Sequence, residues 1–586
     1  MLPVPVEDGF TPKHNSVIDE QFEVLKNLRN ELQQFLPNMK QQHEQLVLAY
    51  SSFKKQQDSW AVSNFSSDQW AKVAKEKECA EAKVRQKAQN ALQNREIWLN
   101  KFESCWNVVK ELLLKVVDED LAQWKRDQQL GGNGGQCLVE RALPLLQSRC
   151  ELLAETLWMN IQQLQSFSDI CTDVPLSSNP NVRLAELKRQ VQVELHRLIQ
   201  STFLIEKQPP QVMKTNTRFT ATARFLVGVK LNVHMSSPVV RVTIISEANA
   251  KAFLNSSGKT VESSGDILNS TGTLEYHSGS NTLTASFRNM QLKKIKRAEK
   301  KGTESVMDEK FALLFQSTFK IANGEFSYSV YALSLPVVVI VHGNQEPHAW
   351  ATVTWDNAFA LPGRLPFLVP DKVPWNQVGQ VLSTKFKSFV GRDLSADAQR
   401  FLAGKAFRNC GLSDYDHMLL SWGQFAKESL PDRNFTLWEW FYALLKVTKE
   451  HMRSLWIDGT ILGFISRKQT EDLLLQCQPG TFLLRFSDTE LGGVTIAWIG
   501  EGAEGSPEVY MLQPFTSRDF AIRGLADRIN DLHNLVYLYP NTPKEHAFGK
   551  YYTRLNEQQP LANGYVKHAL ALTLPGSVVL RLFSLL

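Results

Sequence analysis

Cysteine is scarce in this sequence, which holds seven in 586 residues. No two of them form a C-x-x-C pair; they are Cys79, Cys105, Cys137, Cys150, Cys171, Cys410 and Cys477. An odd number of scattered cysteines fits neither a disulfide framework nor a zinc site. We therefore expect reduced thiols, as in cytosolic or nuclear proteins.

Long apolar runs and catalytic signatures are missing as well. No stretch reaches the roughly 18 consecutive apolar residues of a membrane-spanning helix. The N-terminal MLPVPVEDGF lacks the basic start and apolar core of a signal peptide. The sequence contains no H-R-D, D-F-G or G-x-S-x-G signature and no metal-ligand spacing. We expect no membrane insertion, no cofactor, no metal and no enzymatic activity.

Excess charge is also absent, because the net charge is only +5. Any nucleic-acid-binding surface must therefore be local. Hydrophobic residues make up 43% and charged residues 21%, which is typical of a globular protein. At roughly 150 residues per domain, the length predicts about four domains.

The first part of the chain has the pattern of amphipathic helices. Apolar side chains recur every three or four residues at 18–36, 102–124, 143–164 and 184–198. Breakers stand at GGNGG (131–135) and SSNPN (177–181), and residues 54–95 look like one long solvated helical segment. These features predict a four-helix coiled-coil bundle over residues 1–205.

The period then changes from about 3.6 to two. Every odd residue from Phe219 to Val233 is apolar and nearly every even one is polar or small, which predicts a strand with one wet face. VVRVTIIS, NTLTASFRNM, KFALLFQSTF, LPVVVIVHG and ATVTW continue this pattern. We expect an immunoglobulin-like β-sandwich over residues 206–357.

Three further segments complete the predicted architecture. A helical linker domain is expected over residues 358–456, where tryptophans fill a core; they are Trp375, Trp422, Trp438, Trp440 and Trp456. A small α+β unit is expected over residues 457–556, and a polar tail over residues 557–586. The fold class is thus a multidomain protein of helical bundle, sandwich, helical linker and α+β domain.

A positive charge interrupts the apolar run FLLRFS at residues 482–487. Strand alternation puts Leu483, Arg485 and Ser487 on one face, so Arg485 points inward. An unpaired buried charge is very costly, and Arg485 must therefore have an anion. From the strand alone, two interpretations stay open: a structural ion pair with an Asp or Glu, or a binding site for an anionic ligand.

The residues around Arg485 favour a ligand. Ser487, Asp488 and Thr489 form a polar turn after the strand, which can offer hydroxyls and backbone N–H groups to one anion. Arg467 begins a predicted helix that could pack on the sheet and reach the same point. Arginine suits phosphate because its planar fork binds two oxygens at once. A deeply placed arginine can be reached only by a long phosphorylated side chain, which favours phosphotyrosine over the shorter phosphoserine.

The segment GFISRKQTEDLLLQCQPGTFLLRFSDTELGGVTIAW resembles the Src-homology-2 domain of signal transducers and activators of transcription. QWKRDQQLGGNGG, FLIEKQPPQVMKT, VVVIVHGNQ, TVTWDNAF and VPDKVPW resemble the same family in the same order, over almost the whole chain. The resemblance implies a phosphotyrosine pocket formed by Arg467, Arg485, Ser487, Asp488 and Thr489.

Tyr565, in LANGYVK, resembles the tail tyrosine that this family presents to a tyrosine kinase. Phosphorylation adds close to two negative charges. The resemblance implies Janus-type kinases and the phosphotyrosine motifs of cytokine receptors as partners. It also implies a homodimer in which each tail docks in the pocket of the other copy.

A basic run at residues 288–302 contains Lys293, Lys294, Lys296 and Arg297. Such runs are usually solvated loops, but one between sandwich strands can neutralise DNA phosphates. The resemblance adds Lys214, His342 and Asn344 as residues facing double-stranded DNA.

The resemblance implies a latent cytoplasmic transcription factor that dimerises after phosphorylation, enters the nucleus and binds palindromic DNA. One alternative is a non-enzymatic phosphotyrosine-binding adaptor, and another is a truncated dominant-negative form. We expect this sequence to hold neither the family's N-terminal domain nor its acidic activation tail. We therefore expect DNA binding with weak transcriptional activation.

Overall fold

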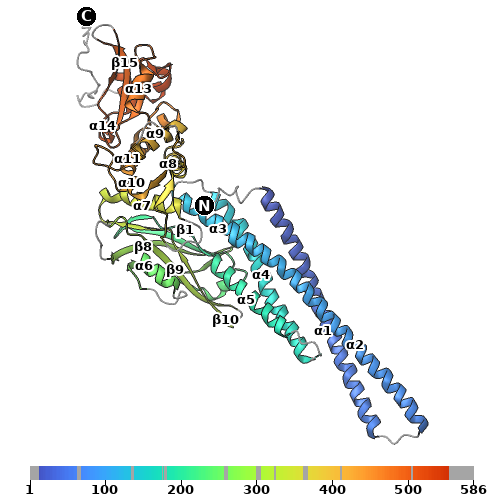
Figure 1. The fold of residues 1–586 in the computed structure, drawn as a ribbon. Helices are drawn as coiled ribbons and strands as arrows, with labels where there is room; N and C mark the ends of the chain where they lie inside the picture. The colour runs from blue at the N-terminus through green and yellow to red at the C-terminus, as the bar shows by residue number, and fades with distance from the viewer. Residues whose placement is uncertain are drawn as a thin grey trace, which may run out of the picture.

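The computed structural model describes residues 12–553 except for 63–66, 134–137, 175, 177–180, 256–261, 299–304, 322–324, 361–366, 409–411, 413 and 503–505. Figure 1 shows an elongated molecule with a helical bundle at one end and a small α+β domain at the other. A β-sandwich and a helical linker domain lie between them.

The bundle confirms the prediction of four antiparallel helices. A π-helix, η1 (Leu114–Asp120), joins α2 and α3 into one long rod. Residues 54–95 are not one helix: α1 ends at Val62 and α2 begins at Ser67, so this segment is the far end of a helical hairpin (Figure 1). The helices are α1 (Pro12–Val62), α2 (Ser67–Leu113), α3 (Leu121–Gly131), α4 (Leu138–Asp173) and α5 (Asn181–Thr202).

Two antiparallel sheets form the predicted sandwich. One has the order β1-β3-β8-β5, with β7 also paired to β8, and the other has the order β10-β9-β4-β6. Phe225, Phe287 and Phe315 fill the space between them. The strands are β1 (Phe203–Lys207), β3 (Arg218–Phe225), β4 (Val239–Ser246), β5 (Gly265–Leu268), β6 (Thr271–Thr273), β7 (Glu275–His277), β8 (Thr282–Ile295), β9 (Phe311–Ile321) and β10 (Phe326–Leu333).

Two predicted strands are wrong. The strand expected over 219–233 ends at Phe225, because the chain turns there and continues into the 3-10 helix η2 (Val233–Ser236). ATVTW (351–355) lies inside the helix α7 (Glu346–Phe359). All residues from Ala351 to Phe359 are buried, so no polar face revealed the helical period.

Helix α7 joins three domains. Strand β11 (Val338–Ile340) and the 3-10 turn η4 (Gly343–Gln345) precede it in the chain. Strand β11 pairs in parallel with β2 (Val212–Lys214). Near its start, Trp438 Nε1 of the linker donates to Pro347 O over 2.6 Å. At its end, the guanidinium of Arg126 from α3 donates to the carbonyls of Ala358 and Ala360 over 2.5 and 3.1 Å.

The linker domain is helical, as predicted. Trp375, Trp438, Trp440 and Trp456 are buried in its core, and the half-exposed Trp422 packs against it. Helix α11 begins with a capping box in which Thr436 and Glu439 bond each other's backbone N–H. The elements are β12 (Lys372–Pro374), α8 (Trp375–Val390), α9 (Ala396–Ala406), β13 (Leu419–Ser421), α10 (Trp422–Ala426), α11 (Leu437–His451) and α12 (Arg453–Ile457).

The C-terminal domain has a central sheet of order β16-β15-β14-β17-β18. The predicted alternation holds in β14: Phe482, Leu484 and Phe486 join the linker core, while Leu483 packs with Leu474 of α13. The main elements are α13 (Arg467–Leu474), β14 (Thr481–Phe486), β15 (Val494–Glu501), β16 (Pro507–Met511), α14 (Ser517–Ile522), α15 (Leu525–Asp531), β17 (Tyr537–Leu538), β18 (Thr542–Pro543) and α16 (Lys544–Phe548). Among the residues described, no helix has the length and apolar character needed to cross a membrane.

Candidate functional site

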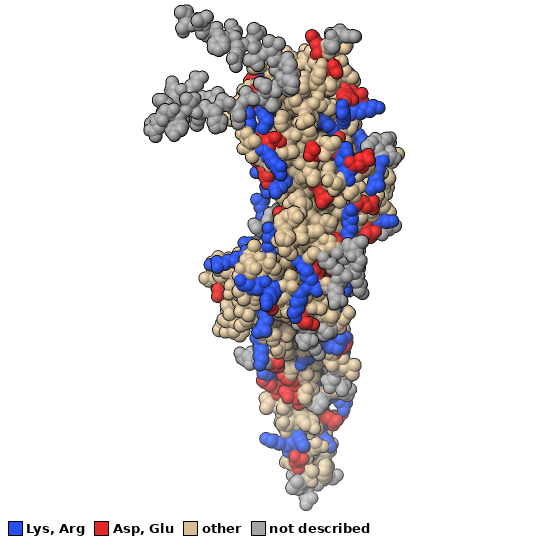
Figure 2. All heavy atoms as spheres, turned by 90° about the vertical axis from the view of Figure 1, so that its left-hand side faces the viewer, with Lys and Arg blue, Asp and Glu red and all other residues tan. Residues whose placement is uncertain are grey.

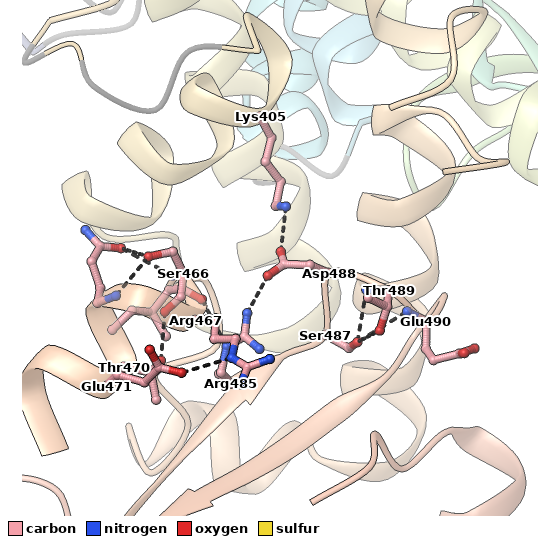
Figure 3. A network of polar contacts seen from close by, with 12 residues as sticks. Lys405, Ser466, Arg467, Thr470, Glu471, Arg485, Ser487, Asp488, Thr489 and Glu490 are labelled. Carbon is pink, nitrogen blue, oxygen red and sulfur yellow. Dashed lines mark hydrogen bonds and ion pairs between the residues drawn. The ribbon is translucent and has the colours of Figure 1, made fainter. Parts of the chain in front are cut away.

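Arg485 lies near the end of β14 and is only 5% exposed. Its Nε donates to the carbonyl of Ile465 over 3.2 Å, just before α13 begins. Its Nη2 lies 2.5 Å from Oδ2 of Asp488, as Figure 3 shows. The inward charge predicted from alternation is therefore present, and in the structure it is matched by a carboxylate of the same domain.

The pairing of Arg485 with Asp488 bears on both interpretations of this arginine. Asp488 pairs with Arg485 as a carboxylate, which can only accept hydrogen bonds and so cannot donate one to a phosphate. It occupies the guanidinium group that a phosphate would need. It stands only three residues from Arg485 and its side chain is 24% exposed, at the rim of the domain. Within the part of the chain described, Nη1 has no hydrogen-bond acceptor. An incoming anion thus meets a charge that is only partly satisfied.

The hydroxyls of the turn have different positions. Ser487 Oγ is buried and accepts the backbone N–H groups of Thr489 and Glu490 over 3.1 and 3.2 Å. Thr489 is exposed, and its Oγ1 lies 3.1 Å from Ser487 Oγ. The amides that we expected to face an anion are therefore bonded within the turn. Ser487 fixes the shape of the loop, and the hydroxyl of the exposed Thr489 is within hydrogen-bond distance of the Ser487 hydroxyl.

Arg467 is the first residue of α13 and its side chain is 74% exposed. Its Nε donates to Glu471 Oε1 over 2.9 Å, one turn further along the helix. Because Arg485 bonds Ile465 two residues earlier, both arginines lie at the start of α13 (Figure 3). The expected convergence on one region is present, with Arg485 deep and Arg467 at the surface.

Three linker residues contact the Ser487–Thr489 turn, and no sequence pattern pointed to them. Lys405 Nζ of α9 lies 2.5 Å from Asp488 Oδ1 (Figure 3). Arg433 Nε donates to the carbonyl of Asp488 over 2.9 Å, and Trp440 Nε1 to that of Ser487 over 2.8 Å. These residues precede the turn by some fifty to eighty positions in another domain, so no local spacing connects them to it.

The second candidate surface lies at one end of the sandwich. Lys214 ends β2 opposite Ile340 of β11, directly before the exposed residues His342 and Asn344. A methyl group added to Gly343 would lie 3.6 Å from Lys214 Nζ. The structure thus brings together the three residues that the family resemblance assigned to DNA.

The basic run divides into exposed and internal side chains. Lys293 and Lys294 are exposed near the end of β8, and the exposed Lys296 lies 3.7 Å from Glu262. Arg297 instead turns inward, pairs with Glu309 at 3.2 Å and donates to Val339 O over 2.7 Å.

Arg297 therefore braces β11, whereas the lysines face solvent. Figure 2 shows Lys and Arg side chains gathered over the middle of the molecule, at the height of the sandwich. Tyr565 lies outside the described residues.

Comparison with known proteins gives four family models along the chain. The coiled-coil domain of STAT transcription factors matches residues 19–198, and the DNA-binding domain of STAT proteins matches residues 207–340. The linker domain of signal transducers and activators of transcription matches residues 362–441, and the SH2 domain matches residues 461–539.

A curated relative, the "Signal transducer and transcription activator" of Drosophila melanogaster, is 45% identical over 478 residues. The alignment covers 78% of this chain and 61% of the relative. The chain therefore spans about three fifths of the length of that relative.

Proposed function

This chain belongs to the family of signal transducers and activators of transcription, and on that premise we propose that it is a signal-dependent, sequence-specific transcription factor without catalytic activity of its own. Phosphotyrosine binding at Arg485 would form the active dimer. The loops at the end of the sandwich would bind double-stranded DNA.

The buried guanidinium of Arg485 is the observation that carries this proposal. A strand interior that holds a permanent charge needs an anion, and the present partner is a single carboxylate at the rim. A phosphate dianion carries more charge and more acceptor oxygens than that carboxylate, so it can replace Asp488 on Arg485. Arg467 and Thr489 are both exposed near this arginine and could bind the remaining oxygens.

Tyr565 supplies the ligand in this proposal. The phosphotyrosines of a cytokine receptor would recruit the chain, and a Janus-type kinase there would phosphorylate Tyr565. The phosphorylated tail of each copy would then bind the pocket of the other. Two reciprocal contacts make an isologous dimer, in which the second contact forms at a high effective concentration. The dimer would then act in the nucleus.

Lys214, His342 and Asn344 form the DNA-facing edge in this proposal, with Lys293, Lys294 and Lys296 on the neighbouring strand end. Such lysines bind phosphates and position the protein, while the exposed loop 341–344 is available to base edges. A two-fold dimer carries two such edges and therefore suits a palindromic site.

The test uses the whole chain in two forms, phosphorylated on Tyr565 and carrying Tyr565→Phe. Light scattering at micromolar concentration should give a dimer only for the phosphorylated form. Duplexes with and without a palindrome should then be titrated at two salt concentrations. We expect the dimer to prefer the palindrome at both, with affinity falling as salt rises.

The same DNA titration distinguishes a transcription factor from a phosphotyrosine-binding adaptor. An adaptor would bind phosphopeptides and show no sequence preference on DNA at either salt concentration. A monomer in both phosphorylation states would contradict the reciprocal dimer.

A further inference from the structure

Asp488 lies between two cations from different domains. Its Oδ2 is 2.5 Å from Arg485 Nη2 of the central sheet, and its Oδ1 is 2.5 Å from Lys405 Nζ of the linker (Figure 3). A carboxylate bridging two cations is stabilised by both, but it also lowers the positive charge available to any other anion at Arg485.

Lys405 is held firmly in this position. Its Nζ lies 5.1 and 5.0 Å from the ring centres of Phe401 and Trp440, and its side chain is only 18% exposed. Cation–π contacts of this kind stabilise the ammonium and fix its direction. The rings of Phe401 and Trp440 therefore hold the ammonium group of the lysine beside the Asp488 carboxylate.

The backbone beside Asp488 is fixed to the linker as well. Its carbonyl accepts from Arg433 Nε and the carbonyl of Ser487 accepts from the buried indole of Trp440. The carboxylate thus has little freedom to leave by moving the loop. Rotation of the side chain, with Oδ1 kept beside Lys405, is the movement by which Oδ2 can leave Arg485.

We propose that Lys405 of the linker is a positioning residue of the phosphotyrosine pocket, which draws Asp488 off Arg485 when a phosphate enters. The phosphate dianion repels the Asp488 carboxylate, which stays paired with the ammonium group of Lys405. Arg485 then becomes free for the ligand without leaving an unpaired charge in the wall of the pocket. This inference rests on the proposed function and extends the pocket beyond the SH2 domain.

Removal of the lysine charge should make Asp488 a stronger competitor. In Lys405→Met the carboxylate has Arg485 as its one cation, so it holds that arginine more tightly. Removal of the competitor should act in the opposite direction, because in Asp488→Asn no carboxylate occupies Arg485. The effect of Lys405 should then almost vanish in the double variant, since its target is gone.

The experiment measures binding of a fluorescent peptide, LANG-phosphotyrosine-VK, to the unphosphorylated full chain by anisotropy. We expect Lys405→Met to weaken binding about fivefold, as for one mostly buried ion pair, and Asp488→Asn to tighten it by a similar factor. In the Asp488→Asn background, Lys405→Met should change affinity by less than about twofold. Lys405→Arg, which keeps the charge, should retain wild-type affinity.

Two results would overturn the inference. Unchanged affinity in Lys405→Met would mean that the lysine does not influence the pocket. An equal or larger loss in the Asp488→Asn background would mean that Lys405 contacts the phosphate itself.

Thermal melting of each variant checks the fold, and Lys405→Gln replaces Lys405→Met if that variant does not fold. Arg485→Ala provides the separate test of the proposed function. If it binds the peptide as well as the wild type, the pocket assignment fails; if only the Lys405 variants behave unexpectedly, the positioning role alone fails.

Discussion

Gln211 and Asn357 exchange two hydrogen bonds through their side-chain amides, at 3.0 and 2.8 Å. Both side chains are buried, and together they join the start of β2 to the end of α7. Gly132, at the end of α3 in the bundle, lies directly against this pair. A methyl group added there would come within 2.5 Å of Gln211 Oε1 and 2.6 Å of Asn357 Nδ2.

We therefore expect Gly132→Ala to destabilise the protein by about 1–3 kcal/mol, because the methyl group would push two buried amides apart and break the hydrogen bonds between them. Gly131→Ala is the matched control, since a methyl group there meets no atom within 4 Å. Urea unfolding of both variants measures the difference. Equal stability of the two would show that the amide pair adjusts freely.

Replacing Arg485 should abolish the phosphotyrosine site while leaving the fold intact. In Arg485→Ala, Asp488 keeps Lys405 as a partner, so we expect a small change in melting temperature. The loss of a buried, charge-assisted contact should weaken phosphopeptide binding by at least about thirtyfold.

Arg467→Ala should weaken phosphopeptide binding only about threefold, because that side chain is mostly exposed and already paired with Glu471. Arg453→Ala, at an exposed position on α12, is the control for nonspecific charge effects. A large loss in Arg467→Ala with a small one in Arg485→Ala would reverse the roles we assign.

Lys294 and Arg297 should differ in what they contribute to DNA binding. Lys294 is exposed, so Lys294→Ala should lower the slope of log affinity against log salt by about one, without changing stability. Arg297→Ala should lower the melting temperature, because it removes the ion pair with Glu309 and the bond to Val339 O.

The salt dependence of Arg297→Ala should stay close to that of the wild type. Binding titrations at several salt concentrations, with melting curves of the same samples, separate the two effects. A reduced slope in Arg297→Ala at unchanged stability would place that guanidinium on the DNA.

Lys385 is a fully buried lysine of the linker, and its Nζ has no hydrogen-bond partner among the residues described. The rings of Trp350, Phe389 and Trp438 surround it, with centres 5.1, 5.6 and 5.9 Å from Nζ. Burial lowers the pKa of Lys385 from 10.5 to about 7. Between these pH values the unfolded chain binds a proton that the folded chain does not.

The contribution of Lys385 to stability therefore improves as pH rises from 7 toward 10, by about 1.4 kcal/mol per pH unit. Lys385→Met should be more stable than the wild type below pH 7, and its advantage should shrink as pH rises to 9. Taking the difference between the two proteins cancels the other titrating groups, including Cys105 and Cys150, whose pKa values burial raises to about 12. A difference that stays constant with pH would mean that Lys385 keeps its proton.

The fold could be predicted in the bundle, where each long helix has one exposed face. In β14, which is buried on both faces, Arg485 revealed the alternation, and the structure confirms that Leu483 shares its face. The pattern failed in α7, where all residues from Ala351 to Phe359 are buried. It also failed after Phe225, where a tight turn brings Gly228 so close to that ring that a methyl group there would lie 2.5 Å from Cδ1.

The pocket could be predicted only in part, for a related reason. The spacing of FLLRFS and the following turn points to Arg485 and Ser487, which are neighbours in the chain. Lys405 and Trp440 reach the same turn from the linker through packing of two domains on one core. No local pattern encodes such a contact.

Helix α7 gives the molecule a fixed internal length. The bundle holds its last carbonyls through Arg126, and the linker holds its start through Trp438, so neither end can swing without breaking hydrogen bonds. We expect the distance between the Arg485 pocket and the sandwich loops to stay nearly constant. In the proposed two-fold dimer, the protein would set the distance between the two loop sets, and the spacing between DNA half-sites would have to match that distance.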